Sequence, residues 1–378
     1  MPGVVFSLEE KLTLAKQISD FGCDFIELMP AVSKEEQFVA KSLSRENINS
    51  TITASTLSKK EHVEIAVECE LEHVTLFTSV SDIHLKNKLG ISREENIERT
   101  LKAIDLAKEQ GLKVAFAGED STRANIDYLI KFIKAIENKI DYFLPCDTMG
   151  CLTVNQTFEF IKKIKQNTKS KINMHCHNDF GLATANTIAG IKAGAEIFSG
   201  TFTGIGERAG NAPIEEVCLV LSELHGFNLK LKLENVTKIC KNVEKFSGIT
   251  LQKHKPVVGE NAFSHESGTH VHGVLKNSKN YENFSPKKIG QKRNIVFGKH
   301  SGKSSLQKIM TKYSKKDIEY ALKKLKKISQ EKKQSLSEME IKSEIILYNL
   351  KKKETKEKKI KNKKGAMINF DRIEHRIK

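Results

Sequence analysis

The chain has 378 residues, of which 39% are hydrophobic, and a formal net charge of +16. This length is enough for one large domain with an accessory part, or for two domains. No run of 18 or more apolar residues is present, which excludes a predicted membrane-spanning helix, and the first residues lack the basic start and apolar block of a signal peptide. We therefore expect a cytoplasmic protein without a membrane partner.

The positive charge is concentrated near the C-terminus. Residues 311–378 contain 22 Lys and Arg against 10 Asp and Glu, whereas residues 1–310 contain 41 against 37. The basic run has no interleaved aromatic residues and contains no nucleic-acid-binding module. It is typical of a solvated helical end, and it does not favour a nucleic-acid partner.

The cysteine pattern indicates reduced thiols. The chain has seven cysteines, an odd number, without C-x-x-C spacing, and most of them lie in apolar runs. We therefore expect buried thiols and no disulfide framework.

Over the first 235 residues, short apolar or β-branched runs alternate with longer amphipathic segments. The strand-like runs cover residues 23–28, 49–55, 73–80, 113–120, 141–147, 171–177 and 196–204. The segments between them, such as "REENIERTLKAIDLAKEQG", have apolar residues three and four positions apart. This alternation predicts an α/β fold with a parallel sheet covered by helices.

Polar residues gather at the C-terminal ends of the predicted strands. The examples are Glu27, Ser55, Glu119, Asp147 and His175. An open doubly wound sheet has similar periodicity, but polar C-terminal ends favour a TIM (β/α)₈ barrel. Because the chain opens with a helix, we predict such a barrel over residues 1–235 with its first strand missing. A helical subdomain over residues 236–310 and a basic helical segment over residues 311–378 follow.

His175 and His177 stand two residues apart at the end of a predicted strand. Alternate strand residues face the same side, so both imidazoles are expected to point into the barrel mouth and to grip a divalent metal. The H-x-H spacing alone is weak support for a metal. Amidohydrolases also use it on a barrel, but near the first strand, which argues against that class.

Several longer stretches resemble one family. They are "AGEDSTRANIDYL", "PCDTMG", "HCHNDFGLATANTIAGIKAGAE", "FTGIGERAGNAPIEEV" and "VVGENAFSHESGTHVHGVL". In order and spacing, over residues 2–310, they resemble the acetyl-CoA-dependent Claisen-condensing synthases that make homocitrate, isopropylmalate and citramalate. The resemblance implies a TIM barrel followed by small helical subdomains, acetyl-CoA and a 2-oxo acid as substrates, and a homodimer in which a subdomain covers the partner's site.

The resemblance also implies a metal centre. His175 and His177 match the metal-binding histidines, and Asn211 matches a residue at or near the metal. A divalent ion, Mn²⁺, Mg²⁺ or Zn²⁺, is expected to act as a Lewis acid on the carbonyl of the 2-oxo acid.

The remaining site residues follow from the same resemblance. Arg123 and Thr148 match residues that hold the 2-oxo acid, and an arginine fork suits a carboxylate. Glu119 matches a carboxylate at the reacting centre, where a base or a partner for one is required. His270 and Tyr281 match a catalytic pair donated by the subdomain, and they are expected to transfer protons.

The sequence departs from the family pattern in two places. Relatives carry a strand before the segment that begins here, with an arginine for the 2-oxo acid and an acidic metal ligand, so an impaired, truncated copy is the alternative of another class. Ser55 and Leu57 stand where homocitrate synthases usually place a histidine and an arginine for the distal carboxylate of 2-oxoglutarate, and we expect the Ser55 hydroxyl to contribute to substrate binding there. The stretches "IELMPAVSKEEQ" and "SDIHLK" nevertheless favour homocitrate synthase acting on 2-oxoglutarate, with isopropylmalate, citramalate and Re-type citrate synthases as alternatives.

Overall fold

The computed structural model describes residues 1–307 and 310–374, which fall into two compact units. Unit 1 comprises Met1–Gly259 together with Lys287–Gly290, and unit 2 comprises Glu260–Pro286 and the chain from Gln291 onward. Within the described ranges, no helix combines the length and the apolar character needed to cross a bilayer. The domain boundaries predicted at residues 235 and 310 stay predictions.

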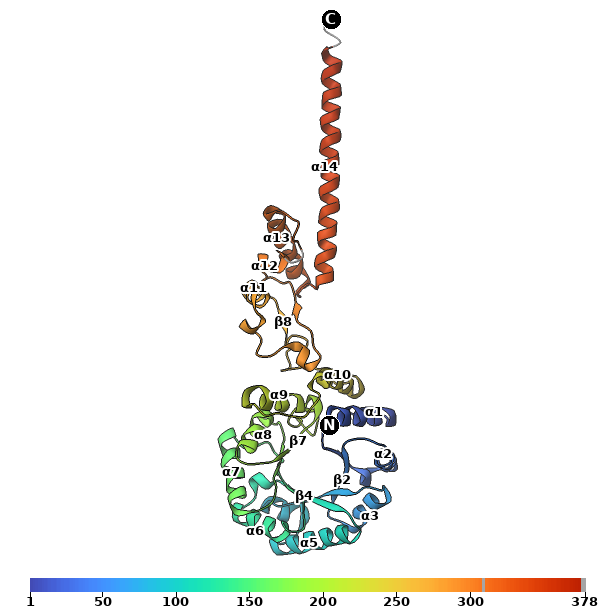
Figure 1. Ribbon diagram of the computed structural model, residues 1–378, viewed down its shortest axis with the longest axis vertical. Helices are drawn as coiled ribbons and strands as arrows, with labels where there is room; N and C mark the ends of the chain where they lie inside the picture. Colours follow the sequence, from blue (N-terminus) through green and yellow to red (C-terminus); the bar gives the residue numbers. More distant parts are fainter. Residues whose placement is uncertain (308–309, 375–378) are drawn as a thin grey trace. The chain divides into compact units, whose positions relative to one another are not determined.

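Unit 1 is built around a sheet of seven parallel strands (Figure 1). The strands are β1 (Phe25–Leu28), β2 (Thr51–Leu57), β3 (His73–Ser79), β4 (Lys113–Glu119), β5 (Phe143–Asp147), β6 (Asn173–Cys176) and β7 (Ile197–Ser199). Each strand pairs with the next one along the chain, and β1 and β7 form the two ends of the sheet. The strands curve about a common axis, which confirms the predicted α/β class and its barrel-type sheet.

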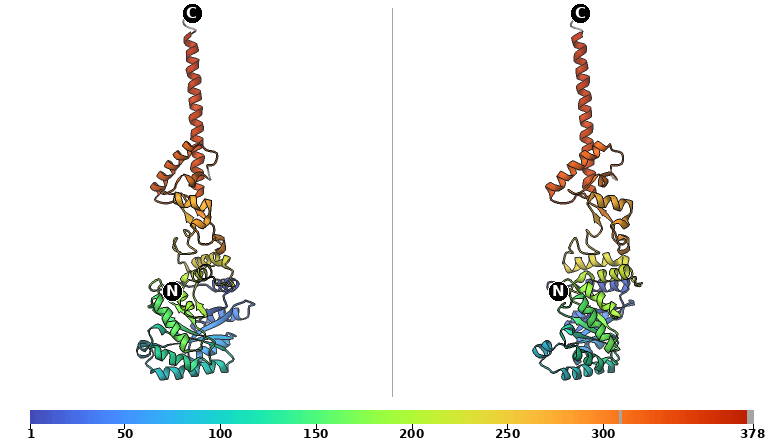
Figure 2. Two further views of the ribbon diagram at one scale, coloured as in Figure 1. Left: turned by 60° about the vertical axis from the view of Figure 1, so that its left-hand side comes forward. Right: turned by 90° about the vertical axis from the view of Figure 1, so that its left-hand side faces the viewer.

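Helices lie along the outside of the curved sheet (Figures 1 and 2). They are α1 (Leu8–Phe21), α2 (Lys34–Ser44), α3 (Lys60–Glu68), α5 (Arg93–Glu109), α6 (Ile126–Ile136), α7 (Val154–Asn167), α8 (Ala183–Lys192) and α9 (Ile214–His225). Local sequence fixes several of their starts, because Ser7 with Glu10 and Thr153 with Gln156 form capping boxes. The buried face of α6 shows the expected spacing, with Leu129, Phe132, Ile133 and Ile136 turned inward.

The core of unit 1 has two layers. Between the strands and helices lie large side chains such as Leu76, Phe116 and Phe132, all fully buried. Inside the curve of the sheet lies a smaller cluster that includes Ala115 and Ala117. Residues on β4 therefore alternate between the helix layer and the barrel interior, as the period of a strand requires.

The seventh predicted run is shorter in the structure than in the sequence pattern. β7 ends at Ser199, and a 3₁₀ turn, η4 (Phe202–Gly204), follows it. A Cβ on Gly200 would lie 2.4 Å from the Ala212 carbonyl oxygen, and Thr203 adopts a positive φ of 67°. The chain therefore turns where β-branched composition alone suggests that the strand continues.

The remaining helices complete the two units. Unit 1 ends with α10 (Val236–Ser247), which packs against α1. Unit 2 contains α11 (Gly268–Lys276), α12 (Lys303–Gln307), α13 (Lys315–Lys332) and α14 (Glu338–Glu374), with the short strands β8 (Ser264–His265) and β9 (Asn294–Ile295). Its own core includes Phe297, Leu306, Leu325 and Leu336, so the predicted helical region after the barrel is present.

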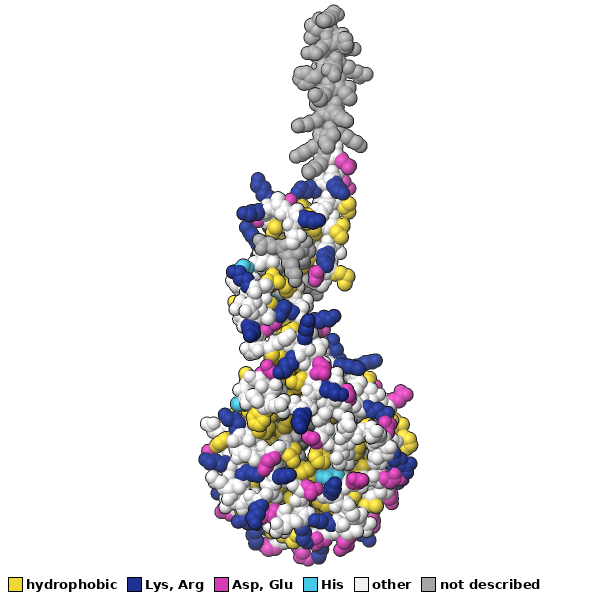
Figure 3. All heavy atoms as spheres, viewed as in Figure 1, with side chains coloured by type: hydrophobic (Ala, Val, Ile, Leu, Met, Phe, Trp, Pro, Cys, Tyr) yellow, Lys and Arg dark blue, Asp and Glu magenta, His cyan; other side chains and the backbone are white. Residues whose placement is uncertain are grey.

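Charges on unit 1 are mixed in sign. On the face that Figure 3 shows, Lys and Arg side chains alternate with Asp and Glu side chains over the helices. This agrees with the near balance of charges in residues 1–310. The basic excess belongs to the C-terminal segment, as the sequence indicates.

The packing of α8 on β6 depends on a glycine. A Cβ on Gly190 would lie 2.4 Å from the sulfur of Met174, which is buried beside His175. The missing side chain lets Met174 pack directly on the helix and fixes the strand that carries the histidine.

We expect Gly190→Ala to lower the free energy of unfolding by about 1–3 kcal/mol, because overpacking outweighs the better helix propensity of alanine. Urea denaturation followed by circular dichroism measures this change. In a protein that already carries Met174→Ala, the same Gly190→Ala substitution should lower the free energy of unfolding by less than it does in the unchanged protein. Equal midpoints for Gly190→Ala and the unchanged protein would contradict the packing argument.

Candidate functional site

The parallel register brings the predicted site residues of unit 1 to one edge of the sheet. Ser79 is paired with Glu119 between β3 and β4, and Cys146 with His175 between β5 and β6. Thr148 follows the last residue of β5, and Ser55 lies near the end of β2. The carboxyl ends of the strands are therefore a shared polar edge, as in barrel enzymes.

His175 and His177 face each other at this edge. Their Nε2 atoms are 3.3 Å apart, and the rings meet edge to face with centroids 5.1 Å apart. His177 lies one residue beyond β6 and is held by an isolated bridge to Asn211. The expected convergence of the two imidazoles is therefore present in the structure.

A hydrogen-bond chain selects the tautomer of His175. Ser199 Oγ lies 3.4 Å from the Met174 carbonyl oxygen, to which its hydroxyl donates, and 2.8 Å from His175 Nδ1. The serine oxygen then accepts from Nδ1–H, which leaves Nε2 with its lone pair free to ligate.

Both imidazoles are held in the neutral state. Burial, and then the neighbouring His177, lower the pKa of His175 to about 4. Burial and the nearby Arg208 also lower the pKa of His177. Neutral imidazole is the form that binds a metal, so no proton has to be displaced near pH 7.

Asn211 stands beside this pair. Its amide nitrogen is 3.4 Å from His175 Nε2, and the amide can present oxygen instead when it is turned over. A Cβ on Gly206 would lie 1.9 Å from Asn211 Oδ1, so the glycine is what admits this side chain.

The donors fit a divalent metal in part. The Nε2 atoms of the two neutral imidazoles converge. In the part of the chain that the structure describes, no group of three or more His, Cys, Asp or Glu is placed to hold an ion. The described residues therefore supply two imidazoles and an amide, a set suited to Zn²⁺ or Mn²⁺.

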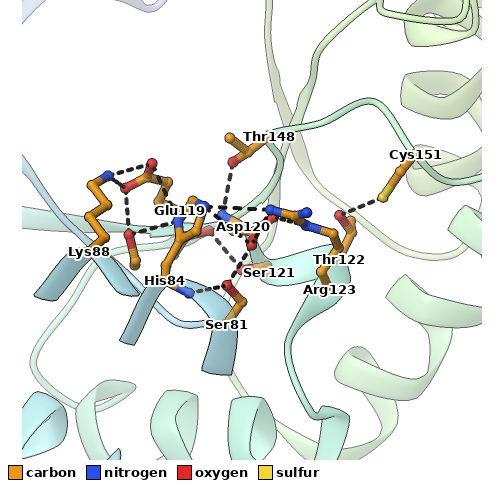
Figure 4. Close-up of polar contacts among 12 residues, drawn as sticks. Ser81, His84, Lys88, Glu119, Asp120, Ser121, Thr122, Arg123, Thr148 and Cys151 are labelled. Atoms are coloured by element: carbon orange, nitrogen blue, oxygen red, sulfur yellow. Dashed lines mark hydrogen bonds and ion pairs between the residues drawn. The ribbon is translucent and has the colours of Figure 1, made fainter. Parts of the chain in front are cut away.

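A second cluster surrounds Glu119 (Figure 4). Lys88 Nζ lies 2.7 and 2.6 Å from the two carboxylate oxygens, and Ser79 Oγ lies 2.7 Å from Oε2. Partial burial raises the pKa of Glu119, but the hydrogen bonds from Lys88 and Ser79 outweigh it and leave the pKa below its usual value. Glu119 is therefore an ionised, paired carboxylate.

Arg123 and Thr148 meet through Asp120. Asp120 is fully buried, and its two oxygens accept from Arg123 Nε at 2.7 Å and Nη2 at 2.9 Å. The Asp120 N–H donates to Thr148 Oγ1 at 2.8 Å, so the threonine hydroxyl keeps its hydrogen for another acceptor. A bound carboxylate at this place would be met by Arg123 Nη1 and the Thr148 hydroxyl.

Asp120 itself adopts a left-handed backbone conformation, with φ 61° and ψ 34°. Aspartate tolerates this region better than most residues, yet it remains uncommon outside glycine. Arg123, Thr148 and Ser81 hold the residue in place, Ser81 through a hydroxyl that donates to Asp120 Oδ2. The conformation turns the chain sharply between Glu119 and Arg123.

Ser55 has a structural partner. It is largely buried on β2, and its side chain hydrogen-bonds to Glu27 of β1. This bond links the two strands inside the sheet.

His270 and Tyr281 belong to unit 2, where the structure brings them together. Their rings stack with centroids 4.1 Å apart and an interplanar angle of 23°. Gly273 on α11 makes room, because a Cβ there would lie 2.5 Å from Tyr281 Cε2. The family resemblance predicts that these two residues act as a pair, and the structure shows that their rings are in contact.

Sequence reasoning did not select Lys88, Ser79, Ser199 or Gly273. The i, i+4 spacing of His84 and Lys88 in "SDIHLKNK" was the available signal for the first. The serines and the glycine carried no local signal, because their roles depend on partners from other elements.

Two family models match the chain. The "HMGL-like" model matches residues 1–243, and the "Homocitrate synthase post-HMGL domain-like" model matches residues 257–338. Together they account for the barrel and for the first part of unit 2.

Curated relatives carry three related names. A putative (R)-citramalate synthase of Archaeoglobus fulgidus is 44% identical over 312 residues, covering 82% of this chain and 64% of that protein. A homocitrate synthase of Methanocaldococcus jannaschii is 45% identical, covering 80% and 75%, and a probable 2-isopropylmalate synthase of Ignicoccus hospitalis is 42% identical, covering 86% and 79%. The match thus spans less than two thirds of the citramalate relative.

Solved structures support the fold. The HMG-CoA lyase of Bacillus subtilis gives a TM-score of 0.59 at 22% identity, covering 66% of this chain and 90% of that chain. The hydroxymethylglutaryl-CoA lyase of Pseudomonas aeruginosa also gives 0.59, at 17% identity, covering 66% and 89%. With the motifs, the family models and the relatives in agreement, the chain belongs to the HMGL-like family, in the group of homocitrate, citramalate and isopropylmalate synthases.

Proposed function

We propose that the protein is an acyltransferase that condenses acetyl-CoA with a 2-oxo acid and then hydrolyses the thioester. The observation that carries the proposal is the facing pair of neutral imidazoles, His175 and His177, at the carboxyl edge of the sheet. The names of the relatives support it, since each is a synthase of this kind. A divalent ion held by His175, His177 and Asn211 would supply a Lewis acid for the 2-oxo carbonyl.

The chain's own residues divide the remaining work. Arg123 Nη1 and the Thr148 hydroxyl bind the carboxylate of the 2-oxo acid. Glu119 acts as an ionised partner at the reacting centre and not as the base, because its lowered pKa is far from neutrality.

The stacked pair in unit 2 is proposed to handle protons. His270 and Tyr281 take the proton from the acetyl methyl group and activate the water that releases CoA. A new carbon–carbon bond forms between that methyl carbon and the keto carbon, and hydrolysis then breaks the carbon–sulfur bond. The proposal includes a homodimer in which subdomains are exchanged.

The acceptor has two candidate classes. The stretches "IELMPAVSKEEQ" and "SDIHLK" favour homocitrate formation from 2-oxoglutarate. The charges at the site favour a 2-oxo acid with a single carboxylate. Lys88 and Arg208 at the edge are already paired, with Glu119 and Asp179, and Arg123 is assigned here to the first carboxylate of the 2-oxo acid.

An impaired copy is the candidate of a different class. Its support is that the described residues provide two imidazoles and an amide, with no acidic third ligand grouped beside them. This candidate predicts silence with every acceptor, so the assays below also test it.

Replacing either histidine should abolish turnover. In an assay of CoA thiol release with Mn²⁺ and each 2-oxo acid, we expect His175→Ala and His177→Ala to lose about a hundredfold or more in rate. Mn²⁺ binding measured by calorimetry should weaken in parallel. Cys176→Ala is the matched control, because that thiol is buried on the opposite side of the strand. Unchanged Mn²⁺ affinity in both histidine variants would overturn the metal assignment.

The acceptor assay distinguishes the two substrate classes. If the paired cations set specificity, kcat/KM for pyruvate or 2-oxoisovalerate should exceed that for 2-oxoglutarate by about tenfold or more, because an unpaired distal carboxylate pays its desolvation cost without a partner. A preference for 2-oxoglutarate would support the homocitrate assignment instead. Product identification by mass spectrometry confirms which acid was extended.

Gly273→Ala should displace Tyr281 from His270. We expect kcat to fall about tenfold or more, with a smaller change in KM, because a misplaced catalytic group costs rate more than binding. Tyr281→Phe keeps the stack but lacks the hydroxyl, and it separates packing from proton transfer. Lys276→Ala, on the exposed side of the same helix, is the control. Normal kcat in both Gly273→Ala and Tyr281→Phe would remove the pair from the mechanism.

A further inference from the structure

Glu119 is a partly buried carboxylate of unit 1 that three groups outside β4 contact (Figure 4). Lys88 donates to both of its oxygens, and Ser79 donates to one of them. His84 Nδ1 lies 3.7 Å from Oε1. The carboxylate comes from β4, whereas all three partners belong to the end of β3 and the turn that follows it.

An unusual backbone delivers the lysine. α4 (Asp82–His84) continues into a single π-helical turn, η2 (Leu85–Leu89), which Gly90 ends with a positive φ of 66°. The N–H groups of Gly90 and Ile91 both reach the Leu85 carbonyl. π turns are rare and are often found at functional sites, since their wider radius re-aims a side chain. Lys88 lies within this turn.

The hydrogen bonds around Glu119 have a fixed direction. An ionised carboxylate only accepts, so the Ser79 hydroxyl donates to it. Ser79 Oγ, 3.1 Å from His84 Nδ1, then accepts from that nitrogen. His84 Nε2 keeps its lone pair and lies 3.5 Å from Arg123 Nη2. One chain of contacts thus connects Glu119 with the arginine proposed to bind the 2-oxo acid.

Several titratable groups face Glu119, and the cation in contact with it favours its ionised form. Lys88 and His84 lie on the turn after β3, Asp120 is the next residue, and Cys146 on the adjacent strand is near enough to be influenced by Glu119. Among the residues that the structure describes, Lys88 is the one permanent cation in direct contact with Glu119, at 2.6 Å. Its side chain is 50% exposed, so replacing it leaves the core of unit 1 intact.

We propose that Lys88 is a positioning residue, which the π turn brings to Glu119 so that this carboxylate is oriented and kept ionised beside the reacting centre. The inference rests on the proposed function for the role of Glu119. The contact itself is defined by the structure and can be tested without turnover.

The test compares Lys88→Met and Lys88→Arg with Lys86→Met in the full chain with Mn²⁺. Lys86 is the matched control, because it is an exposed lysine on the same π turn. Two quantities are measured: the pH profile of kcat/KM, and the titration of the Glu119 side-chain carboxyl by ¹³C NMR, assigned with Glu119→Gln. Circular dichroism confirms that the variants are folded.

Removing the ammonium should make Glu119 easier to protonate. For Lys88→Met we expect its pKa, and the acidic limb of the kcat/KM profile, to rise by about one pH unit or more, with kcat/KM about tenfold lower at neutral pH. Lys88→Arg should keep the pKa of Glu119 and kcat/KM close to those of the unchanged protein. Lys86→Met should change neither the pKa nor kcat/KM. An unchanged titration of Glu119 in Lys88→Met would overturn the inference. If the unchanged protein turns over no acceptor, the proposed function fails, and the NMR titration still decides the role of Lys88.

Discussion

The parallel register of the seven strands is the constraint on which the site depends. Because every strand runs in the same direction, residues that are distant in sequence end at one edge of the sheet. Glu119 and His175 reach that edge on β4 and β6, and β5 between them carries Asp147 and then Thr148. A shift of one residue in either pairing would turn these side chains toward the helices.

Around this edge the molecule keeps its charges paired and its histidines neutral. Lys88, Arg123 and Arg208 each contact a carboxylate, while burial lowers the pKa of the two facing imidazoles. Partly buried pairs of this kind hold their geometry before a ligand arrives, so little reorganisation is needed on binding. The proposed cation site and the proposed carboxylate site therefore lie on one edge of the sheet.

Small residues make several of these close approaches sterically possible. Gly206 admits Asn211, Gly190 admits Met174 next to His175, and Gly273 admits the ring of Tyr281. In each case a β-carbon would lie within 2.5 Å of the side chain that the site needs. Their effect is therefore exerted through the neighbours they accommodate, and they have no chemistry of their own.

The sequence by itself determined the α/β alternation, the approximate place of all seven strands and the pairing of His175 with His177, because these features depend on periods of two and 3.6 residues within short segments. It could not determine the early end of β7, where Gly200 approaches a distant carbonyl oxygen. Only the tertiary structure decided that Lys88, 31 residues away, holds Glu119, that Asp120 occupies the fork of Arg123, and that Ser199 sets the tautomer of His175. Those contacts join separate elements, or depend on a left-handed backbone turn, so no local period or propensity encodes them.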